Sequence, residues 1–152
     1  MLRLVRTDSD NQDFQSLVML LDHYLAEIDD DEHAFYAQFN KVASLSHVVV
    51  AYLDDAPVGC GAFKPYAAET VEIKRMFVQP AHRGQGVARA VLAALEQWAA
   101  ELGYAGCVLE TGQRQAAAIA LYQRSGYART PNYGQYVGVE NSVCLAKALA
   151  RP

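Results

Sequence analysis

The residues at 83–88, Arg-Gly-Gln-Gly-Val-Ala, have the types and spacing of a phosphate-binding loop. Small residues at positions 84, 86 and 88 leave the neighbouring backbone N–H groups uncovered, and the loop opens a predicted helix whose start carries partial positive charge. Arg83 adds a full positive charge, so the segment suits a diphosphate group. A strand-to-helix turn that needs glycine for positive φ is the structural alternative, and these six residues alone favour neither.

Two better-known glycine motifs for phosphate do not fit this segment. No Gly-Lys pair follows Gly84 at the spacing of a P-loop, and Arg89 stands where a dinucleotide-binding G-x-G-x-x-G motif needs its third glycine. A second pair, Gly59 and Gly61, lies inside a strand-like run, where glycine predicts a bulge or a close backbone contact.

The loop must be positioned by the elements around it. Residues 70–80 form a strand-like run that ends at a proline, and residues 86–102 carry an apolar stripe at helical spacing. The loop thus joins a strand to an amphipathic helix that covers a sheet face.

The remaining elements follow from the same periodicities. Further strands are predicted at 2–7, at 47–66 as two strands joined by a turn, at 107–111 and at 143–149, with an aromatic, turn-rich stretch at 127–136. Further helices are predicted at 13–27, 28–41 and 116–125. The order β-α-α-β-β-β-α-β-α-β-β predicts an α/β (α+β) fold, a mixed sheet with helices packed on it, in one domain of residues 1–152.

Composition limits the function classes. The 152 residues are 52% hydrophobic and 20% charged, as in an ordinary globular domain, and the formal net charge is −4. The 13 Lys and Arg residues are scattered rather than gathered in a basic stripe, which argues against nucleic-acid binding. No segment has the character of a signal peptide or a membrane span, so we expect a cytoplasmic protein with no membrane partner.

The three cysteines, Cys60, Cys107 and Cys144, are widely spaced in apolar, strand-like surroundings. Neither His nor Cys stands near them at metal-ligand intervals, so no metal is expected. Buried free thiols in a reducing compartment are the better interpretation.

Three segments with characteristic spacing follow one another along the chain. Arg83, Gly86 and Ala88 form the pattern Arg-x-x-Gly-x-Ala, the strand-like run 71–78 precedes it, and the segment AIALYQRSGY at 118–127 follows it. These segments resemble the [RQ]-x-x-G-x-[GA] signature, the fourth strand and the A-I-x-L-Y-x-x-x-G-[FY] segment of the GNAT superfamily of N-acetyltransferases. The resemblance covers about residues 48–127 and implies a mostly antiparallel sheet of six to seven strands flanked by about four helices.

The resemblance implies acetyl transfer from acetyl-CoA to a primary amine, of a small molecule or an amino acid, by direct attack in a ternary complex. In the family, the end of the fourth strand contacts the pantetheine arm, which here indicates Met76, Phe77 and Val78. Amides of the next loop bind the pyrophosphate, which indicates Arg83, Gly84, Gln85, Gly86, Val87 and Ala88. Gln115 replaces a family Asn that contacts the cofactor, and its longer side chain departs from that pattern.

Transfer to an amine requires a base, because alkyl amines are cationic at neutral pH. Strand alternation is expected to place residues 72, 74 and 76 on one face and residues 71, 73, 75 and 77 on the other. Glu72 stands where family members that use a glutamate base often carry it, and an ion pair with a neighbouring Lys or Arg is its alternative role. Glu110 is the second candidate base, with a capping or loop-tethering role as its alternative.

The departing thiolate needs a proton donor, and a phenol can supply the proton. The tyrosine of the family's helical segment lies near the sulfur, which implies this role for Tyr122; a core aromatic is the alternative. A backbone N–H on the fourth strand, that of Phe77, is expected to stabilise the oxyanion.

Two aromatic regions flank the acceptor side by analogy with the family. One holds Tyr36 and Asn40 on the second predicted helix, and the other holds Tyr133 and Tyr136 before the last strand. Aromatic walls with amides suit a small amine, and local packing clusters are the alternative. The rival function is a non-catalytic acyl-CoA-binding regulatory module. Homodimers are common among similar proteins, and the sequence leaves this state open.

Overall fold

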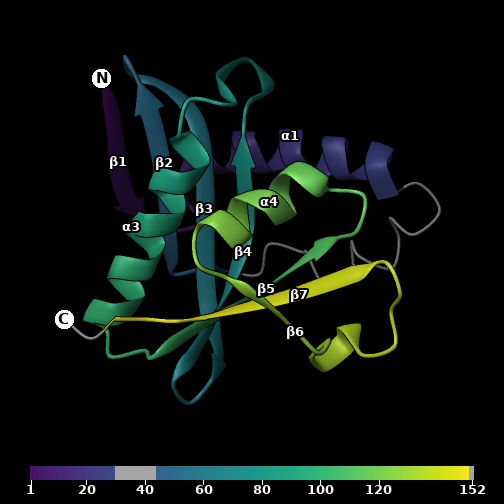
Figure 1. The fold of residues 1–152 in the computed structure, drawn as a ribbon. Coiled ribbons are helices and arrows are strands. Elements are labelled where there is room, and N and C mark those ends of the chain that lie inside the picture. The colour runs from purple at the N-terminus through teal and green to yellow at the C-terminus, as the bar shows by residue number, and fades with distance from the viewer. Residues whose placement is uncertain (30–43, 151–152) are drawn as a thin grey trace.

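The computed structural model describes residues 1–29 and 44–150 of the chain (Figure 1). Its elements are β1 (Leu2–Thr7), α1 (Gln12–Asp29), β2 (His47–Leu53), β3 (Ala56–Ala67), β4 (Thr70–Val78), η2 (Pro80–His82), α3 (Val87–Glu101), β5 (Gly106–Gly112), α4 (Ala116–Arg124), β6 (Ala128–Thr130), η3 (Gly134–Tyr136) and β7 (Ser142–Ala148). Within the described residues, none of the helices has the length and apolar character needed to cross a membrane.

The order of these elements agrees with the predicted order. Seven strands and three α-helices are present among the described residues, against the predicted six to seven strands and about four helices. The difference in helix number concerns the second predicted helix, at 28–41, because all but its first two residues lie outside the described part of the chain.

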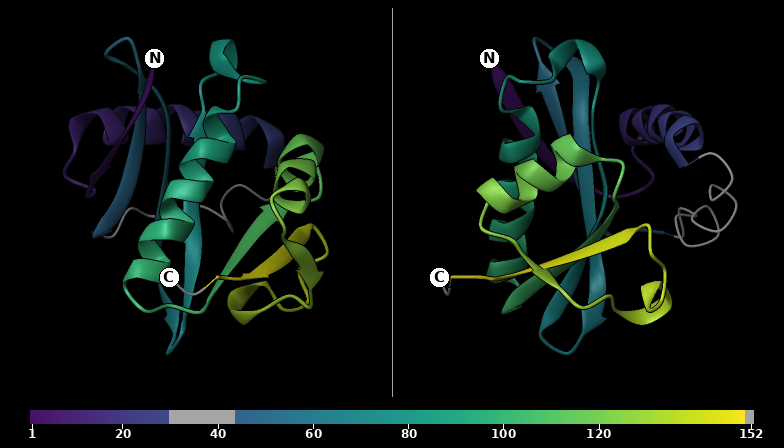
Figure 2. Two further views of the ribbon diagram at one scale, coloured as in Figure 1. Left: turned by 60° about the vertical axis from the view of Figure 1, so that its left-hand side comes forward. Right: turned by 45° about the vertical axis from the view of Figure 1, so that its right-hand side comes forward.

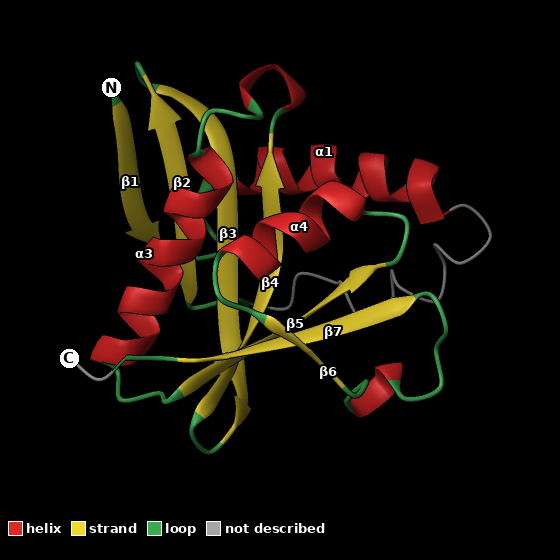
Figure 3. Ribbon diagram, in the orientation of Figure 1, coloured by secondary structure: helices red, strands yellow, loops and turns green. Residues whose placement is uncertain are grey.

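The strands form one sheet in the order β1-β2-β3-β4-β5-β7-β6, in which every pair except β4–β5 is antiparallel. The predicted mostly antiparallel sheet is thus confirmed. β4 and β5 pair only where residues 70–72 meet residues 106–108. Beyond that point β4 continues to Val78 and β5 to Gly112, and the two strands diverge (Figure 3). This divergence opens the sheet beside the end of β4.

Helices cover both faces of the sheet, with α3 and α4 on one face and α1 on the other (Figure 2). On α3 the buried residues Val87, Val91 and Leu95 recur at helical spacing and pack with Phe63 in one hydrophobic cluster. On the opposite face, Phe14 of α1 belongs to a second cluster. Cover on both sides explains why β2, with the sequence HVVVAYL, is apolar almost throughout.

α3 approaches β3 closely at the two glycines that the sequence singled out. A Cβ at Gly61 would lie 2.5 Å from Met76 Sδ and 2.8 Å from Leu95 Cδ1, and a Cβ at Gly59 would lie 2.9 Å from a methyl carbon of Val87. A larger residue at either position would force its neighbours to move. The sequence predicted a bulge or a close backbone contact at this pair: the register with β4 shifts between Cys60 and Ala62, and a Cβ at Gly59 would lie 3.1 Å from the Phe77 carbonyl oxygen, whereas the other contacts are with side chains.

A β-bulge interrupts β4 at Arg75. The register with β3 slips at this point, and Arg75 has a φ of 61°. The extra residue reverses the alternation of faces beyond the bulge. Met76 consequently packs in the same cluster as Ile73, on the α3 side, whereas Phe77 packs on the α1 side. The predicted alternation, with Glu72 and Met76 on one face and Ile73 and Phe77 on the other, is therefore wrong beyond the bulge.

The three cysteines are free and buried, as predicted. Burial raises the pKa of the Cys60 thiol to about 12 and that of the Cys107 thiol to about 11. Both thiols therefore stay protonated at neutral pH.

Candidate active site

A cavity of about 720 Å³ lies where β4 ends and where α3 and α4 begin. Its volume is within the range of small-molecule binding pockets. It is lined by most of the residues that the family resemblance indicated for the cofactor: Met76, Phe77, Val78, Arg83, Gly84, Gly86, Val87, Ala88 and Gln115. Gln85 is exposed and does not line it. The fold thus brings together three separate segments of the predicted cofactor site.

The start of α3 presents bare backbone N–H groups to this cavity. Gly84 and Gly86 have φ angles of 77° and 81°, which glycine adopts without strain, and a Cβ at either would point into open space. Gly86 is the N-cap residue and supplies no side-chain cap, and the first helical hydrogen bond runs from Ala90 N–H to the Gly86 carbonyl. The N–H groups of residues 87–89 therefore have no acceptor within the helix and form a site for an anion.

Arg83 ties this loop to the end of β4. Its Nε donates a hydrogen bond of 3.0 Å to the carbonyl oxygen of Val78, and its guanidinium carbon lies 4.9 Å from the centre of the Tyr24 ring. Three further cations line the same cavity: Arg89, Arg114 and Arg124. No local sequence pattern marks these three, because they come together only in the fold. The positive charges favour a polyanionic ligand.

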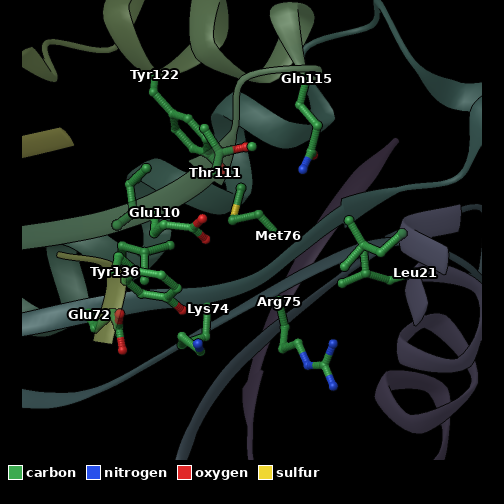
Figure 4. Close-up of a pocket in the computed structure, with 14 residues that line it drawn as sticks. Leu21, Glu72, Lys74, Arg75, Met76, Glu110, Thr111, Gln115, Tyr122 and Tyr136 are labelled. Atoms are coloured by element: carbon green, nitrogen blue, oxygen red, sulfur yellow. The ribbon is translucent and has the colours of Figure 1, made fainter. Parts of the chain in front are cut away.

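A second, smaller cavity of about 90 Å³ lies between the diverging ends of β4 and β5 (Figure 4). Residues shared by both linings show that the two cavities adjoin: Leu21, Met76, Gln115 and Tyr122. The smaller cavity also contains charged side chains of both signs: Glu72, Lys74, Arg75 and Glu110. A molecule in the smaller cavity would therefore meet a ligand of the larger one beside Tyr122.

Tyr122, on α4, stands at the junction of the two cavities. Its side chain is 7% exposed and packs edge-on against Tyr127, with ring centres 5.9 Å apart. Burial raises the pKa of the Tyr122 phenol, and the carboxylate of Glu110 raises it further. No residue in the described part of the chain forms a hydrogen bond with its hydroxyl group. The phenol is therefore protonated and able to donate a hydrogen bond to a ligand.

Glu72 is 2% exposed, and both of its carboxylate oxygens have partners. Oε2 accepts a hydrogen bond of 2.7 Å from the hydroxyl group of Tyr133, and Oε1 lies 3.8 Å from Nζ of Lys64. Burial, and then the Glu72 carboxylate, raise the pKa of Tyr133. The ion pair that was the alternative role of Glu72 is thus present, and the residue also lines the smaller cavity.

Glu110 faces the cavity from β5. It accepts a hydrogen bond of 2.7 Å from Oγ of Ser142, so a tethering contact is present here too. In Figure 4 its carboxylate points toward Met76 in the middle of the view, whereas Glu72 lies past the ring of Tyr136. Of the two carboxylates, Glu110 is the one that acts on the pKa of Tyr122.

Of the four residues predicted to bind the acceptor, the structure places two at or near the smaller cavity. Tyr136 is buried and lines the smaller cavity. Tyr133 contacts the Tyr136 ring edge-on at 5.8 Å and reaches the site through Glu72 rather than by lining the cavity. Tyr36 and Asn40 lie outside the described residues.

Lys74 and Arg75 line the smaller cavity but were not predicted as site residues. Burial lowers the pKa of Lys74, while the carboxylates of Glu72 and Glu110 act in the opposite direction. Nη1 of Arg75 donates a hydrogen bond of 2.6 Å to Oδ1 of Asp22 on α1. The bulge that places both side chains here has no sequence signal, because arginine is not a residue that favours positive φ.

A helix start with uncapped N–H groups and a protonated phenol thus converge where the sheet opens, an arrangement suited to acyl transfer from a phosphate-bearing donor. The chain belongs to the GNAT family of acetyltransferases, since the model of the Acetyltransferase (GNAT) family matches residues 12–127. The resemblance drawn from three short segments is confirmed.

Individual relatives agree with this family. The chain is 36% identical over 138 residues to the IAA acetyltransferase of Azospirillum brasilense, with 88% of each protein covered. It is similar to the crystal structure of a Klebsiella pneumoniae protein assigned as an acyl-CoA N-acyltransferase, with 29% identity, a TM-score of 0.83 and 99% of each chain covered. A GNAT family acetyltransferase from Elizabethkingia anophelis, solved with acetyl-CoA bound, shares the fold at 19% identity and a TM-score of 0.70, over 97% of this chain and 98% of that one.

The predicted class of N-acetyltransferase is confirmed by the family and these relatives. They give no support to the alternative of a non-catalytic acyl-CoA-binding module.

Proposed function

We propose that the protein transfers an acetyl group from acetyl-CoA to the primary amine of a small molecule or an amino acid, by direct attack in a ternary complex. The observation that carries this proposal is the meeting of the two cavities at Tyr122. One cavity suits a polyanionic donor, and the other offers carboxylates to an amine. Two substrates bound together would react there without a covalent intermediate on the protein.

The larger cavity fits acetyl-CoA, which when bound supplies an acetyl group activated as a thioester. The N–H groups of residues 87–89 would hold the pyrophosphate, and Arg114 and Arg124 add positive charge. After Glu72, β4 has no strand partner on its β5 side, so the backbone at 76–78 would hydrogen-bond the extended pantetheine arm. Acetyl-CoA bound to the Elizabethkingia anophelis relative supports this choice of ligand.

The transfer requires two proton movements. The amine loses a proton before its nitrogen forms the new C–N bond, and the sulfur gains a proton as the C–S bond breaks. We assign the second proton to Tyr122, because its raised pKa keeps the phenol protonated. The backbone N–H of Phe77 is the proposed donor to the oxyanion that develops during attack.

The first proton goes to a carboxylate of the smaller cavity. Glu72 is the base predicted from the sequence, and Glu110 is the second candidate. The electrostatic effect of Glu110 on Tyr122 supports Glu110, because it indicates that this carboxylate lies near the phenol.

Thiol release from acetyl-CoA, measured with a broad panel of amines, tests the proposal. At least one amine should raise the release well above hydrolysis, and mass spectrometry should detect the acetylated amine. Binding of acetyl-CoA without stimulated release by any amine would overturn the catalytic proposal.

A further inference from the structure

Two adjacent cationic residues of β4, Lys74 and Arg75, line the same small cavity. In a regular strand neighbouring side chains point to opposite faces. The bulge at Arg75, with its φ of 61°, removes this alternation. Non-glycine residues in this conformation are strained and concentrate at functional sites. With the alternation removed, Arg75 reaches Asp22 on α1, and two cationic residues lie together on the lining of the smaller cavity.

These two cations share the cavity with two carboxylates. Glu72 and Glu110 line it as well, and both act electrostatically on Lys74. The side chain of Arg75 is only 5% exposed and pairs with Asp22, which is 48% exposed. Figure 4 shows Lys74 between Glu72 and Arg75. Partners within the protein hold these groups, so the cavity presents both signs of charge before any acceptor binds.

A simple amine is poorly matched to this charge pattern. It arrives as an ammonium ion at neutral pH, and Lys74 and Arg75 repel it even where Glu72 or Glu110 attracts it. A polyamine, with several positive charges, is matched worse. An acceptor with its own carboxylate removes the conflict, because its two ends pair with opposite charges. The cavity volume of about 90 Å³ also favours a small molecule.

On the basis of the N-acetyltransferase function proposed above, we propose that the acceptor is a small zwitterionic amino acid. Lys74 and Arg75 hold its carboxylate, and its amino group lies toward Glu110, beside Tyr122. Lys74 and Arg75 are then specificity-determining residues that select amino acids over simple amines.

The test compares small amino acids with their amides, which keep the amine and the side chain but lack the carboxylate charge. In the wild-type protein, kcat/KM for the preferred amino acid should exceed that for its amide by about 10-fold or more, as expected for a charge-assisted hydrogen bond. In Lys74→Gln this ratio should fall by about 10-fold, mainly through KM. Lys147→Gln is the matched control, because Lys147 also pairs with a glutamate, Glu96, but lines neither cavity, and it should leave the ratio unchanged.

A second readout does not depend on turnover. The preferred amino acid, but not its amide, should raise the melting temperature of the wild-type protein, and Lys74→Gln should lose this shift. If Lys74→Gln does not fold, the preference of the wild-type protein for amino acids over their amides tests the inference by itself. Amides or simple amines acetylated as fast as amino acids would overturn the inference and leave the proposed function standing. No stimulated thiol release with any amino acid, amide or amine would instead overturn the proposed function itself.

Discussion

The two cavities that meet at Tyr122 are built from different parts of the chain. The larger one offers bare backbone N–H groups at the start of α3 and a side of β4 without a strand partner among the described residues, with arginine side chains around them. The smaller one offers side chains, with both signs of charge on β4 and a carboxylate on β5. The polar groups that the larger cavity offers thus depend mainly on backbone conformation, whereas those of the smaller cavity depend on which side chains are present.

This division determines how each site responds to substitution. A backbone site tolerates exchange of most side chains as long as the turn keeps its shape, whereas one substitution alters the charge pattern of the smaller cavity. A substitution in the smaller cavity should therefore change its charge while the larger cavity keeps its shape.

Tyr122 lines both cavities, and its substitution should cause the largest decrease in kcat. Tyr122→Phe removes the proton donor but keeps the ring that packs against Tyr127, so kcat should fall by about 1,000-fold. Acetyl-CoA binding, measured by calorimetry, should stay near the wild-type value because the proposed contacts to acetyl-CoA lie mainly at the end of β4, the start of α3 and nearby arginines. An unchanged kcat would exclude Tyr122 from the mechanism.

Substitutions of the two carboxylates of the smaller cavity should lower kcat to different extents. Glu110→Gln should lower kcat by about 100-fold, within the range of general base catalysis, and should leave acetyl-CoA binding near the wild-type value. Glu72→Gln should lower kcat less, because Glu72, unlike Glu110, does not act on the pKa of Tyr122. Steady-state rates of both variants show which carboxylate is the base. A greater loss of kcat in Glu72→Gln than in Glu110→Gln would identify Glu72 instead.

The backbone character of the larger cavity can be tested with two glycines of equal conformation. Gly86 and Gly138 both have a φ of 81°, and a Cβ at either meets open space. Gly86→Glu should weaken acetyl-CoA binding by about 10-fold, or about 1.4 kcal/mol, because it places negative charge at the start of α3.

Gly138→Glu is the matched control for this experiment, because Gly138 lines neither cavity. Both variants should lose about 1–2 kcal/mol of stability from the left-handed conformation. Calorimetric titration with acetyl-CoA should separate them. Equal affinity in the two variants would contradict an anion site at the start of α3.

The smallest effect is expected from substitution of His47, which lines neither cavity and should change only the pH dependence of stability. Its ring stacks on Phe63 at 4.7 Å and meets Trp98 edge-on at 4.8 Å, and burial lowers its pKa. The His47 imidazole therefore binds a proton more readily in the unfolded chain than in the folded protein. The free energy of unfolding should consequently decrease as the pH falls below about 6.5.

Thermal unfolding between about pH 8 and pH 5 measures the contribution of His47. His47→Phe keeps an aromatic ring that cannot be protonated, so its stability should depend less on pH than that of the wild type. The same pH dependence in both proteins would show that His47 makes no such contribution.

The loop at 83–88 was predictable because its information is local. Two glycines one residue apart, ahead of an apolar helical pattern, specify the turn whose φ angles the structure shows. The proposal of an anion site, rather than a turn alone, needed more distant residues, because it rests on the family resemblance. The proposed role of Tyr122 depends on the same resemblance.

The acceptor side could not be predicted in this way, because it depends on tertiary structure. The bulge at Arg75 arises from the register of β3 and β4, and without it simple alternation placed Met76 and Phe77 on the wrong faces. The smaller cavity exists because β4 and β5 stop pairing after Glu72. Neither feature leaves a pattern in the sequence.

The burial of all three cysteines makes the protein a suitable background for site-specific labelling. Inaccessible thiols with a raised pKa should resist maleimide reagents, so no native cysteine needs replacement. Tyr66 is 44% exposed, and its ring lies 4.9 Å from that of Tyr133, the residue bonded to Glu72. A fluorophore on Tyr66→Cys would therefore report on occupancy of the smaller cavity without altering any residue that lines it.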